Sequence, residues 1–357
     1  MSHYRLSLIG LGNVARNLVR LLERKRGLLQ EKHGVTYSIT GIATGRHGFA
    51  VNPSGLDAGQ ALELAESGQS VSSLSTFPVE NALDVIRHSQ ADVMFENSPV
   101  NTQTGQPALD HIRLALHLGQ HAITANKGPV VHGYRELTAL ARSKGRSFCF
   151  ESTVLGGAPV FSVFREAFPL AELSSFRGIL NATTNIILSR MENGESYEDG
   201  LRYCQSVRVA ETDPTNDVDG WDAAIKVAAL VTVLMDTPFT PQQVSPTGIR
   251  GITPEMIASA RAQGKRYKLV CSAERAGESV HASVAPQLVD ASSPLYGMMN
   301  SSTGVTFRTD VVPDYSIILS EREGMSGGPV ETAYGLFADF VNLARHAAPQ
   351  QQLGDSQ

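Results

Sequence analysis

The 357 residues carry a formal net charge of −5, and 42% of them are hydrophobic. This length suits two packed domains, the negative charge gives no electrostatic reason to expect nucleic acid as a partner, and neither a membrane-spanning helix nor a signal peptide is predicted. The three cysteines are scattered and odd in number, which favours a reducing compartment. We therefore expect a cytoplasmic protein with small-molecule ligands.

The first part of the chain alternates between β-rich and helical patterns. We expect strands over residues 4–9, 36–43, 91–95, 121–124 and 147–150. We expect helices over residues 14–29, 61–66, 80–88, 109–118 and 134–143, and an irregular glycine-rich stretch after residue 43. Strands that alternate with helices form parallel βαβ units. Residues 1–150 are therefore predicted to be an α/β domain with a Rossmann-type, doubly wound parallel sheet.

The pattern changes near residue 151. A glycine-rich loop is followed by further predicted strands, over residues 175–180, 268–273, 279–284, 305–308 and 316–319, and by an apolar helix over 221–235. Strands that lie close together after a run of helices are typical of an α+β fold. We expect residues 151–323 to form this second domain, with a mixed sheet. A last helix, within 324–350, is predicted to return to the first domain, and the last ten or so residues are predicted to fray.

The turn between the first strand and the first helix matches a dinucleotide-binding fingerprint with alanine as its third small residue. It reads Gly10-Leu11-Gly12-Asn13-Val14-Ala15. The first glycine allows the tight turn, the second lets a pyrophosphate approach the backbone, and the alanine lets helix and strand pack closely. The free N–H groups of the helix then bind phosphate. The alternative is a plain tight turn, but the position at the start of a βαβ series favours the nucleotide.

The end of the second strand bears on the choice of cofactor. It reads Ile42-Ala43-Thr44-Gly45-Arg46-His47 and lacks the carboxylate that usually binds an adenosine ribose diol. Arg46, with help from His47, is well placed for a 2′-phosphate. A solvated loop arginine is the alternative explanation. We therefore expect NADP(H) as the preferred cofactor, with NAD(H) as the alternative.

A carboxylate-rich loop runs into an almost wholly apolar helix over residues 211–226. Asp222 and Lys226 are four residues apart, so they share one face of that helix. A lysine in such a helix is costly to bury unless it is paired or faces a cleft. A structural ion pair explains these two residues equally well in isolation. Glu211 and Asp217, just upstream, favour a cluster that holds an ammonium-bearing substrate and sets the protonation of the lysine.

A second lysine, Lys127, follows the predicted strand 121–124. Ligands of such sheets bind at the carboxyl ends of the strands, which favours a cofactor-side role over a plain surface lysine. The chemistry also calls for such groups. Reduction of an aldehyde needs hydride from a nicotinamide and a proton for the developing alkoxide, and an ammonium group stabilises that oxyanion and supplies the proton.

From end to end, the chain resembles homoserine dehydrogenase. The segments that carry the resemblance are the turn at 10–15, Glu96-Asn97-Ser98-Pro99 with Thr124-Ala125-Asn126-Lys127, the segment 178–188, Gly327-Gly328-Pro329-Val330-Glu331-Thr332-Ala333, and above all residues 211–226, which match a long family signature position by position. The resemblance implies reversible, NAD(P)H-dependent reduction of L-aspartate 4-semialdehyde to L-homoserine, in the pathway to threonine, methionine and isoleucine. It also implies a homodimer built through the second domain.

The resemblance also assigns residue roles. Lys226 would be the proton donor and acceptor, and Lys127 would bind substrate and approach the nicotinamide. Further implied groups are the substrate-side residues Glu211, Asp217, Asp222 and Thr183, the cofactor-side residues Asn97, Ser98 and Gly328, and a monovalent-cation site, for sodium, at Glu151, Val154, Gly156 and Ala158. Two departures from the family pattern are Ala182 and Ile186, which stand where glycine and tyrosine are usual. The alanine is expected to narrow the substrate pocket slightly.

The sequence leaves two rival functions to consider. Aspartate-semialdehyde dehydrogenase needs a nucleophilic cysteine, and none of Cys149, Cys204 and Cys271 lies in a recognisable nucleophile loop. A catalytically inactive NADP-binding sensor of the same fold is expected to lack Lys226 or Lys127, and both are present. A sensor would bind NADPH and homoserine without turnover, so titration of the protein with both separates these cases.

Overall fold

A computed structural model describes residues 1–320 and 328–347 of the chain. The described residues form two compact units. The first comprises Met1–Pro129, Gly133–Ser152 and the helix that begins at Pro329, and the second comprises Val130–His132 and the described part of Thr153–Gly328. No helix of the described residues is long and apolar enough to cross a membrane.

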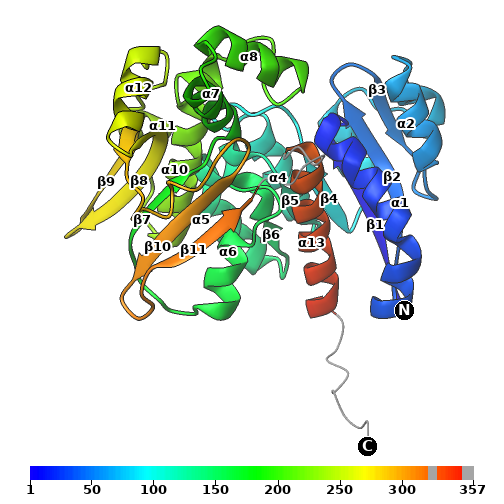
Figure 1. The fold of residues 1–357 in the computed structure, drawn as a ribbon. Helices are drawn as coiled ribbons and strands as arrows, with labels where there is room; N and C mark the ends of the chain where they lie inside the picture. The colour runs from blue at the N-terminus through cyan, green and yellow to red at the C-terminus, as the bar shows by residue number, and fades with distance from the viewer. Residues whose placement is uncertain (321–327, 348–357) are drawn as a thin grey trace, which may run out of the picture. The chain divides into compact units, whose positions relative to one another are not determined.

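The first unit contains a six-stranded sheet in the order β3-β2-β1-β4-β5-β6 (Figure 1). Its strands are β1 Ser2–Ile9, β2 Val35–Thr44, β3 Gly48–Val51, β4 Val93–Glu96, β5 His121–Thr124 and β6 Phe148–Cys149. All neighbours are parallel except β2 and β3, which form an antiparallel hairpin. The Rossmann-type sheet is thus confirmed. The expectation of an irregular stretch after residue 43 is wrong, because a three-residue turn folds β3 back along β2.

Helices cover both faces of this sheet. They are α1 Asn13–His33, α2 Ala58–Glu66, α3 Ala82–His88, α4 Ala108–His117, α5 Lys127–Ser143 and α13 Pro329–Ala347, with a short 3₁₀ turn η1 at Val71–Leu74. Alternate residues of a strand point to opposite faces. Accordingly, Leu8 packs into a core with α1, α2 and α13, whereas its neighbour Ile9 packs into a second core with α3, α4 and α5. The sheet is therefore doubly wound.

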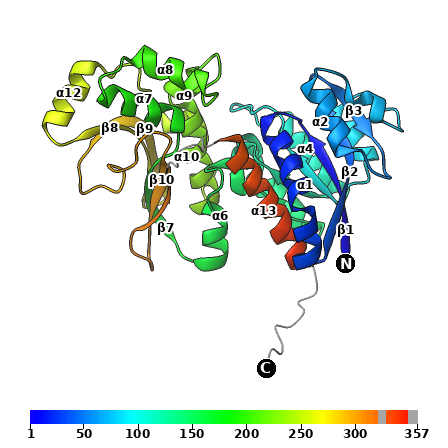
Figure 2. The same cartoon turned by 45° about the vertical axis from the view of Figure 1, so that its right-hand side comes forward.

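The helix from the end of the chain packs in the first unit. Figures 1 and 2 show α13 beside α1, and Leu336 and Phe340 of α13 are fully buried in the same core as β1. The Phe340 ring makes edge contacts with Tyr4 and Phe95. The regularly spaced apolar residues of 331–345 therefore pack against the sheet of the first unit. About 180 residues separate this helix from β6 in the sequence.

The second unit contains a five-stranded sheet in the order β11-β10-β7-β8-β9. Its strands are β7 Leu173–Ile179, β8 Arg266–Ala276, β9 Ser279–Val289, β10 Thr303–Thr309 and β11 Tyr315–Leu319. Every strand pair is antiparallel, so the expectation of a mixed sheet is wrong. For one pair the reason is local: a two-residue turn at Gly277, whose φ is +63°, joins β8 to β9, and so short a link connects only antiparallel strands.

Helices of the second unit cover one face of that sheet. The helical segments are η2 Glu151–Thr153, which spans the boundary between the units, α6 Val160–Ser162, the π-helical turn η3 Val163–Ala167, α7 Ala182–Glu192, α8 Tyr197–Ser206, α9 Thr215–Val218, α10 Trp221–Leu234, α11 Pro241–Val244 and α12 Pro254–Ala262. Helices α7, α10, α11 and α12 all contact β8 or β9. Helix α10 is buried along most of its length, which explains why its sequence is almost wholly apolar apart from Asp222 and Lys226.

Candidate active site

The glycine turn after β1 has the geometry of a ligand cradle. Gly10 has φ +96°, and a Cβ atom there would lie 2.4 Å from the backbone oxygen of Asn97, so only glycine fits. Gly12 is different: its φ is −76°, and apart from Gly12 itself and its chain neighbours no described residue lies within 4 Å of the position of a Cβ atom. Gly10 is therefore required by the fold, whereas the open space at Gly12 is available to a ligand.

The N-terminus of α1, which follows this turn, is suited to an anion. Gly12 is its N-cap and supplies no capping side chain, and the first turn contains no acidic residue. The first N–H groups of a helix have no partner within the helix and lie at the positive end of its dipole. Ala15, fully buried, lets α1 pack closely on the sheet. The residues at this turn therefore fit the pyrophosphate of a dinucleotide.

Arg46 and His47 lie in the turn between β2 and β3. Arg46 is exposed and forms no hydrogen bond or ion pair with another described residue. The backbone N–H of His47 donates to the Thr44 hydroxyl over 2.5 Å. The His47 Nδ1 atom is buried without a partner among the described residues. No carboxylate lies in the turn, so its charge and its hydrogen-bonding groups favour an anionic ligand.

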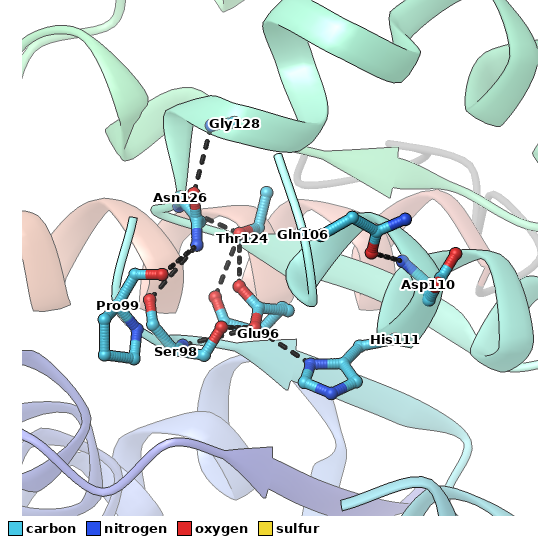
Figure 3. Close-up of polar contacts among 9 residues, drawn as sticks. All are labelled: Glu96, Ser98, Pro99, Gln106, Asp110, His111, Thr124, Asn126 and Gly128. Carbon is cyan, nitrogen blue, oxygen red and sulfur yellow. Dashed lines mark hydrogen bonds and ion pairs between the residues drawn. The ribbon is translucent and has the colours of Figure 1, made fainter. Parts of the chain in front are cut away.

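The loops that follow β4 and β5 are joined by polar contacts (Figure 3). Asn126 caps α5 by accepting a hydrogen bond from the Gly128 N–H over 3.0 Å, and its amide donates to the Ser98 carbonyl over 3.1 Å. Lys127 is the first residue of α5. Both polar atoms of the Asn97 side chain are buried without a partner among the described residues, and such groups are rare unless a ligand or water satisfies them.

In the second unit, the expected ion pair is present. The Lys226 ammonium lies 2.9 Å from Asp222 Oδ2, one helical turn earlier on α10. It also donates to the Leu180 carbonyl over 2.6 Å. The side chains of Asp222 and Lys226 are 22% and 15% exposed, so the pair is largely withdrawn from water yet still reachable. A buried ion pair of this kind is costly to assemble, which makes a purely stabilising role a weak explanation.

Asn181 joins the ion pair to the loop carboxylate, and the sequence analysis did not single it out. Its Nδ2 donates to Asp217 Oδ1 over 2.7 Å and to Asp222 Oδ2 over 3.0 Å. Its Oδ1 accepts from both the backbone and the hydroxyl of Thr184, so Asn181 is also the N-cap of α7. The only signal in the sequence was its position just before a helix, where asparagine is a preferred cap.

Asp217, on α9, completes this group of side chains. Thr183 donates a hydrogen bond to its second oxygen over 3.2 Å. Burial and the neighbouring Asp222 charge raise the pKa of Asp217, against the opposing effects of Asn181, Lys226 and Thr183. Two carboxylates face one ammonium here, so when all three groups are ionised the cluster has one excess negative charge. The cluster therefore suits a further cation, such as an ammonium group.

Other expected site residues lie apart from this cluster, Glu211, Gly328 and Glu151 among them. Glu211 is exposed; its carbonyl accepts from Gln205 over 3.3 Å, and its carboxylate contacts no other described residue. Gly328 is described, but the segment 321–327 that precedes it lies outside the described residues. Of the expected cation ligands, Glu151 belongs to the first unit, where its backbone N–H donates to Asp339 over 3.0 Å. The other ligands belong to the second unit.

The cysteines do not provide a nucleophile. Cys204 and Cys271 are fully buried, and burial raises the pKa of each thiol to about 12. A thiol is nucleophilic as the thiolate, so these two are inert at neutral pH. Cys149 is half-buried at the end of β6. This distribution speaks against a thioester mechanism.

The doubly wound sheet with its open glycine turn and the lysine–carboxylate cluster define the class of this protein: it is an NAD(P)-dependent dehydrogenase. A family model described as homoserine dehydrogenase matches residues 159–341. The chain is 32% identical over 354 residues to an NAD(+)-dependent homoserine dehydrogenase of Pseudomonas canavaninivorans, with 99% of each chain covered. It is also 32% identical to the homoserine dehydrogenase of Methanocaldococcus jannaschii, with 94% of this chain and 97% of that one covered. The chain belongs to the homoserine dehydrogenase family.

Solved structures agree with this assignment. The structure of a homoserine dehydrogenase from Thiobacillus denitrificans superposes with a TM-score of 0.79 at 26% identity, and the match covers 98% of this chain and 76% of that one. The protein is therefore an oxidoreductase of amino-acid biosynthesis that interconverts L-aspartate 4-semialdehyde and L-homoserine with a nicotinamide nucleotide. The alternative of an inactive sensor is not supported.

Proposed function

We propose that Lys226 transfers the proton in this reaction. A nicotinamide nucleotide bound at residues 10–15 would supply the hydride that reduces the aldehyde. The Lys226 ammonium then gives a proton to the alkoxide oxygen, so that an N–H bond breaks and an O–H bond forms. In the reverse direction the neutral amine takes that proton from homoserine. The observation that carries the proposal is the contact of Lys226 with Asp222 and with the Leu180 carbonyl, because these acceptors orient the ammonium and stabilise its charge.

Asp217 and Asp222 are proposed to receive the amino end of the substrate, with Thr183 at its side. The excess negative charge of the cluster supports this assignment, since a second ammonium group would neutralise it. The hydrogen bonds from Asn181 and Thr183 fix the carboxylates before substrate arrives. Adding L-aspartate 4-semialdehyde to enzyme and NADPH should lower the NADPH absorbance, whereas an aldehyde of similar length without the amino group should react far more slowly.

The roles of Lys127 and Glu211 rest on the family resemblance. We assign Lys127 to the substrate and the nicotinamide, and Glu211 to the substrate amino group. Support for Lys127 is its place as the first residue of α5, directly after the Asn126 cap. Glu211 is exposed and is assigned to the substrate alone, so its replacement should affect only substrate binding. Glu211→Gln should raise the KM for aspartate semialdehyde without changing the KM for NADPH.

The cofactor is proposed to lie over residues 10–15, with Asn97 and Ser98 on its nicotinamide side. The contrast between two glycines supports this site. Gly12→Ala adds a methyl group where no protein atom interferes, so its melting temperature should equal that of wild type while its affinity for NADPH falls by about tenfold or more. Gly10→Ala forces a contact with the Asn97 backbone and should destabilise the fold. Unchanged NADPH affinity in Gly12→Ala would reject this site.

We further propose NADP(H) as the preferred cofactor. Support comes from the unpartnered, exposed Arg46, from the buried, unpartnered His47 Nδ1, and from the lack of a carboxylate at the end of β2. Guanidinium is a permanently charged fork that matches phosphate oxygens. The relative from Pseudomonas canavaninivorans is named for NAD(+), so the dissociation constants of NADP and NAD for this chain are the deciding measurement.

A monovalent cation, sodium, is proposed at Glu151 and the backbone oxygens of Val154, Gly156 and Ala158. The support is the chemistry of this donor set, because carbonyl oxygens and one carboxylate suit a hard cation. If the site exists, replacing sodium chloride by choline chloride at equal ionic strength should lower the melting temperature. Unchanged melting across sodium concentrations would remove the proposal.

A homodimer is proposed through the second unit. The sheet face opposite its helices presents a polar row across the strands, formed by Ser283, Ser272, Arg177, Thr306 and Ser316. Acidic and basic groups, Glu274 and Arg308 among them, lie in the neighbouring row. A face with both charge signs can pair with itself across a two-fold axis. The other face of this sheet packs on helices of the same unit. Light scattering that shows only monomer at micromolar concentration would exclude the dimer.

A further inference from the structure

A carboxylate is buried at the centre of the first unit. Glu96, the last residue of β4, is fully buried. It pairs in register with Ile9 of β1 and with Thr124 of β5, so it lies where the strand order of the sheet reverses. Ligands of such sheets bind outside the carboxyl ends of the strands at this reversal. A buried carboxylate is costly unless hydrogen bonds satisfy it, so its partners indicate why it is there.

The partners of Glu96 come from three separate segments (Figure 3). Its Oε1 atom accepts from the backbone N–H of Ser98 over 3.2 Å, from the Ser98 hydroxyl, and from His111 Nδ1 over 3.3 Å. The other oxygen faces the Thr124 hydroxyl at 3.5 Å. His111 lies on α4, and its side chain is only 8% exposed. Glu96 therefore ties α4 and the loop after β4 to the end of β5.

These contacts close a ring of hydrogen bonds. The Thr124 hydroxyl donates to the Glu96 carbonyl over 2.9 Å and accepts from the Asn126 N–H over 2.9 Å. The Asn126 side-chain amide donates a hydrogen bond to the Ser98 carbonyl over 3.1 Å, which closes the ring. The ring thus joins the loop after β4 to the loop after β5. It fixes the residue between Glu96 and Ser98, which is Asn97, and the residue after Asn126, which is Lys127.

Asn97 is the residue whose amide the ring leaves unsatisfied. Its Nδ2 and Oδ1 atoms are both buried without a partner among the described residues. Its backbone packs against the glycine turn, because a Cβ on Gly10 would lie 2.4 Å from its oxygen. Leaving buried polar groups unpaired is costly. The group that satisfies them must offer one acceptor and one donor side by side, as a carboxamide does.

We propose that Glu96, held by His111, is a positioning residue that fixes Asn97 so that its amide receives the carboxamide of the nicotinamide ring. This inference rests on the proposed cofactor site at residues 10–15. Glu96 and His111 do not touch the cofactor in this account and act through the ring of hydrogen bonds. Loss of the Glu96 carboxylate or of the His111 imidazole releases the nicotinamide half of the cofactor and leaves the adenine half bound as before.

The test compares the whole cofactor with its adenine half. Dissociation constants for NADPH and for adenosine 2′,5′-bisphosphate are measured by calorimetry. In Glu96→Gln an amide nitrogen can replace the accepting oxygen, so NADPH should bind about tenfold more weakly while the affinity for the bisphosphate is unchanged. His111→Leu, which removes the donor, should show the same split. His111→Asn, which keeps a donor in that position, should restore most of the NADPH affinity.

A matched control separates this role from general destabilisation. Gln120, at the opposite end of β5, is buried and donates to the Ile86 carbonyl over 2.8 Å. Gln120→Met should lower the melting temperature without altering the ratio of the two dissociation constants. If Glu96→Gln does not fold, the two His111 variants decide the question. Equal weakening of both ligands, or of neither, in Glu96→Gln and His111→Leu would overturn the inference. Failure of wild type to bind either ligand would instead overturn the cofactor site itself, and the inference with it.

Discussion

The turn after β1 and the cluster around Lys226 are built on opposite plans. At the turn, the binding groups are backbone N–H donors, an open glycine and a helix start without acidic residues. At the cluster, charged side chains already contact one another: Lys226 meets Asp222, and Asn181 bridges Asp222 and Asp217. At the turn, the hydrogen-bond donors are available to a ligand. At the cluster, the charged side chains are already oriented by their contacts with one another.

This difference assigns binding and chemistry to different groups. Backbone donors bind phosphate equally in the ground state and the transition state, so they govern affinity rather than turnover. Charges held in fixed orientation stabilise the transition state without reorganisation, so they govern turnover. Substitutions in the first unit should therefore change dissociation constants, and substitutions in the cluster should change kcat. The predictions at Lys226 and Arg46 test that division, and those at Asp217 and Ala182 test how the cluster is built.

The largest effect is expected at Lys226. Lys226→Met removes the proposed proton donor, so kcat should fall by about 10²-fold or more, the scale of general acid–base catalysis, while the dissociation constant of NADPH stays unchanged. Lys226→Arg keeps the positive charge beside Asp222 but cannot release a proton in this pH range. It should fold and bind cofactor as wild type does, and should be nearly as inactive as Lys226→Met. Steady-state rates near wild type in either variant would reject the role of Lys226.

An intermediate effect is expected at Arg46. Arg46→Ala should weaken NADP binding by about ten- to a hundredfold, the value of a charge-assisted hydrogen bond, and should leave NAD binding unchanged. At saturating cofactor its kcat should equal that of wild type. Calorimetric titration with NADP and with NAD gives the ratio of the two dissociation constants. If wild type binds NAD as tightly as NADP, or the substitution leaves their ratio unaltered, Arg46 is a solvated loop residue.

A smaller effect, on stability, is expected at Asp217. Because its pKa is raised in the folded protein, the folded state holds this proton more readily than the unfolded chain does. The stability from that proton is complete below the ordinary carboxyl pKa and is lost as the pH rises through the raised value. Asp217→Asn, which cannot ionise, should therefore melt at a higher temperature than wild type at pH 8. The difference should shrink toward pH 4, and a difference that grows there would contradict this account.

The smallest effect is expected at Ala182, which stands where the family usually has glycine. It is the first residue of α7 and is half-buried. Ala182→Gly removes one methyl group beside the cluster, so the KM for aspartate semialdehyde should change by less than about fivefold, with kcat and the KM for NADPH unchanged. A large change in kcat would mean that this position governs the orientation of the cluster rather than the width of the pocket.

Much of the first unit could be predicted from the sequence because its signals are local. The turn at 10–15 lies within one βαβ unit, and the pairing of Asp222 with Lys226 follows from their helical spacing alone. Helix α5 was harder. It begins at Lys127, seven residues before the expected start, because Gly128 and Pro129 read as helix breakers although proline is tolerated in a first turn.

The contacts that could not be predicted join residues far apart in the sequence. Asn181 meets Asp217 and Asp222 across about 40 positions, and nothing in the local pattern distinguishes it from an ordinary helix cap. Glu96 meets His111 only because α4 packs behind β4. Glu211 is the opposite case. Proximity in the sequence suggested that it joins the cluster, but the loop before α9 leaves it exposed.

The most direct test of the division between binding and chemistry is a double-mutant cycle between Arg46 and Lys226. NADP dissociation constants and saturating kcat values are measured for wild type, Arg46→Ala, Lys226→Met and the double variant. The account predicts that Arg46→Ala weakens NADP binding by the same factor with lysine or methionine at position 226, and that Lys226→Met lowers kcat by the same factor in both backgrounds, within about 0.5 kcal/mol, or roughly twofold. A dependence of either factor on the other residue beyond that limit would show that binding and proton transfer are coupled, and would contradict the account.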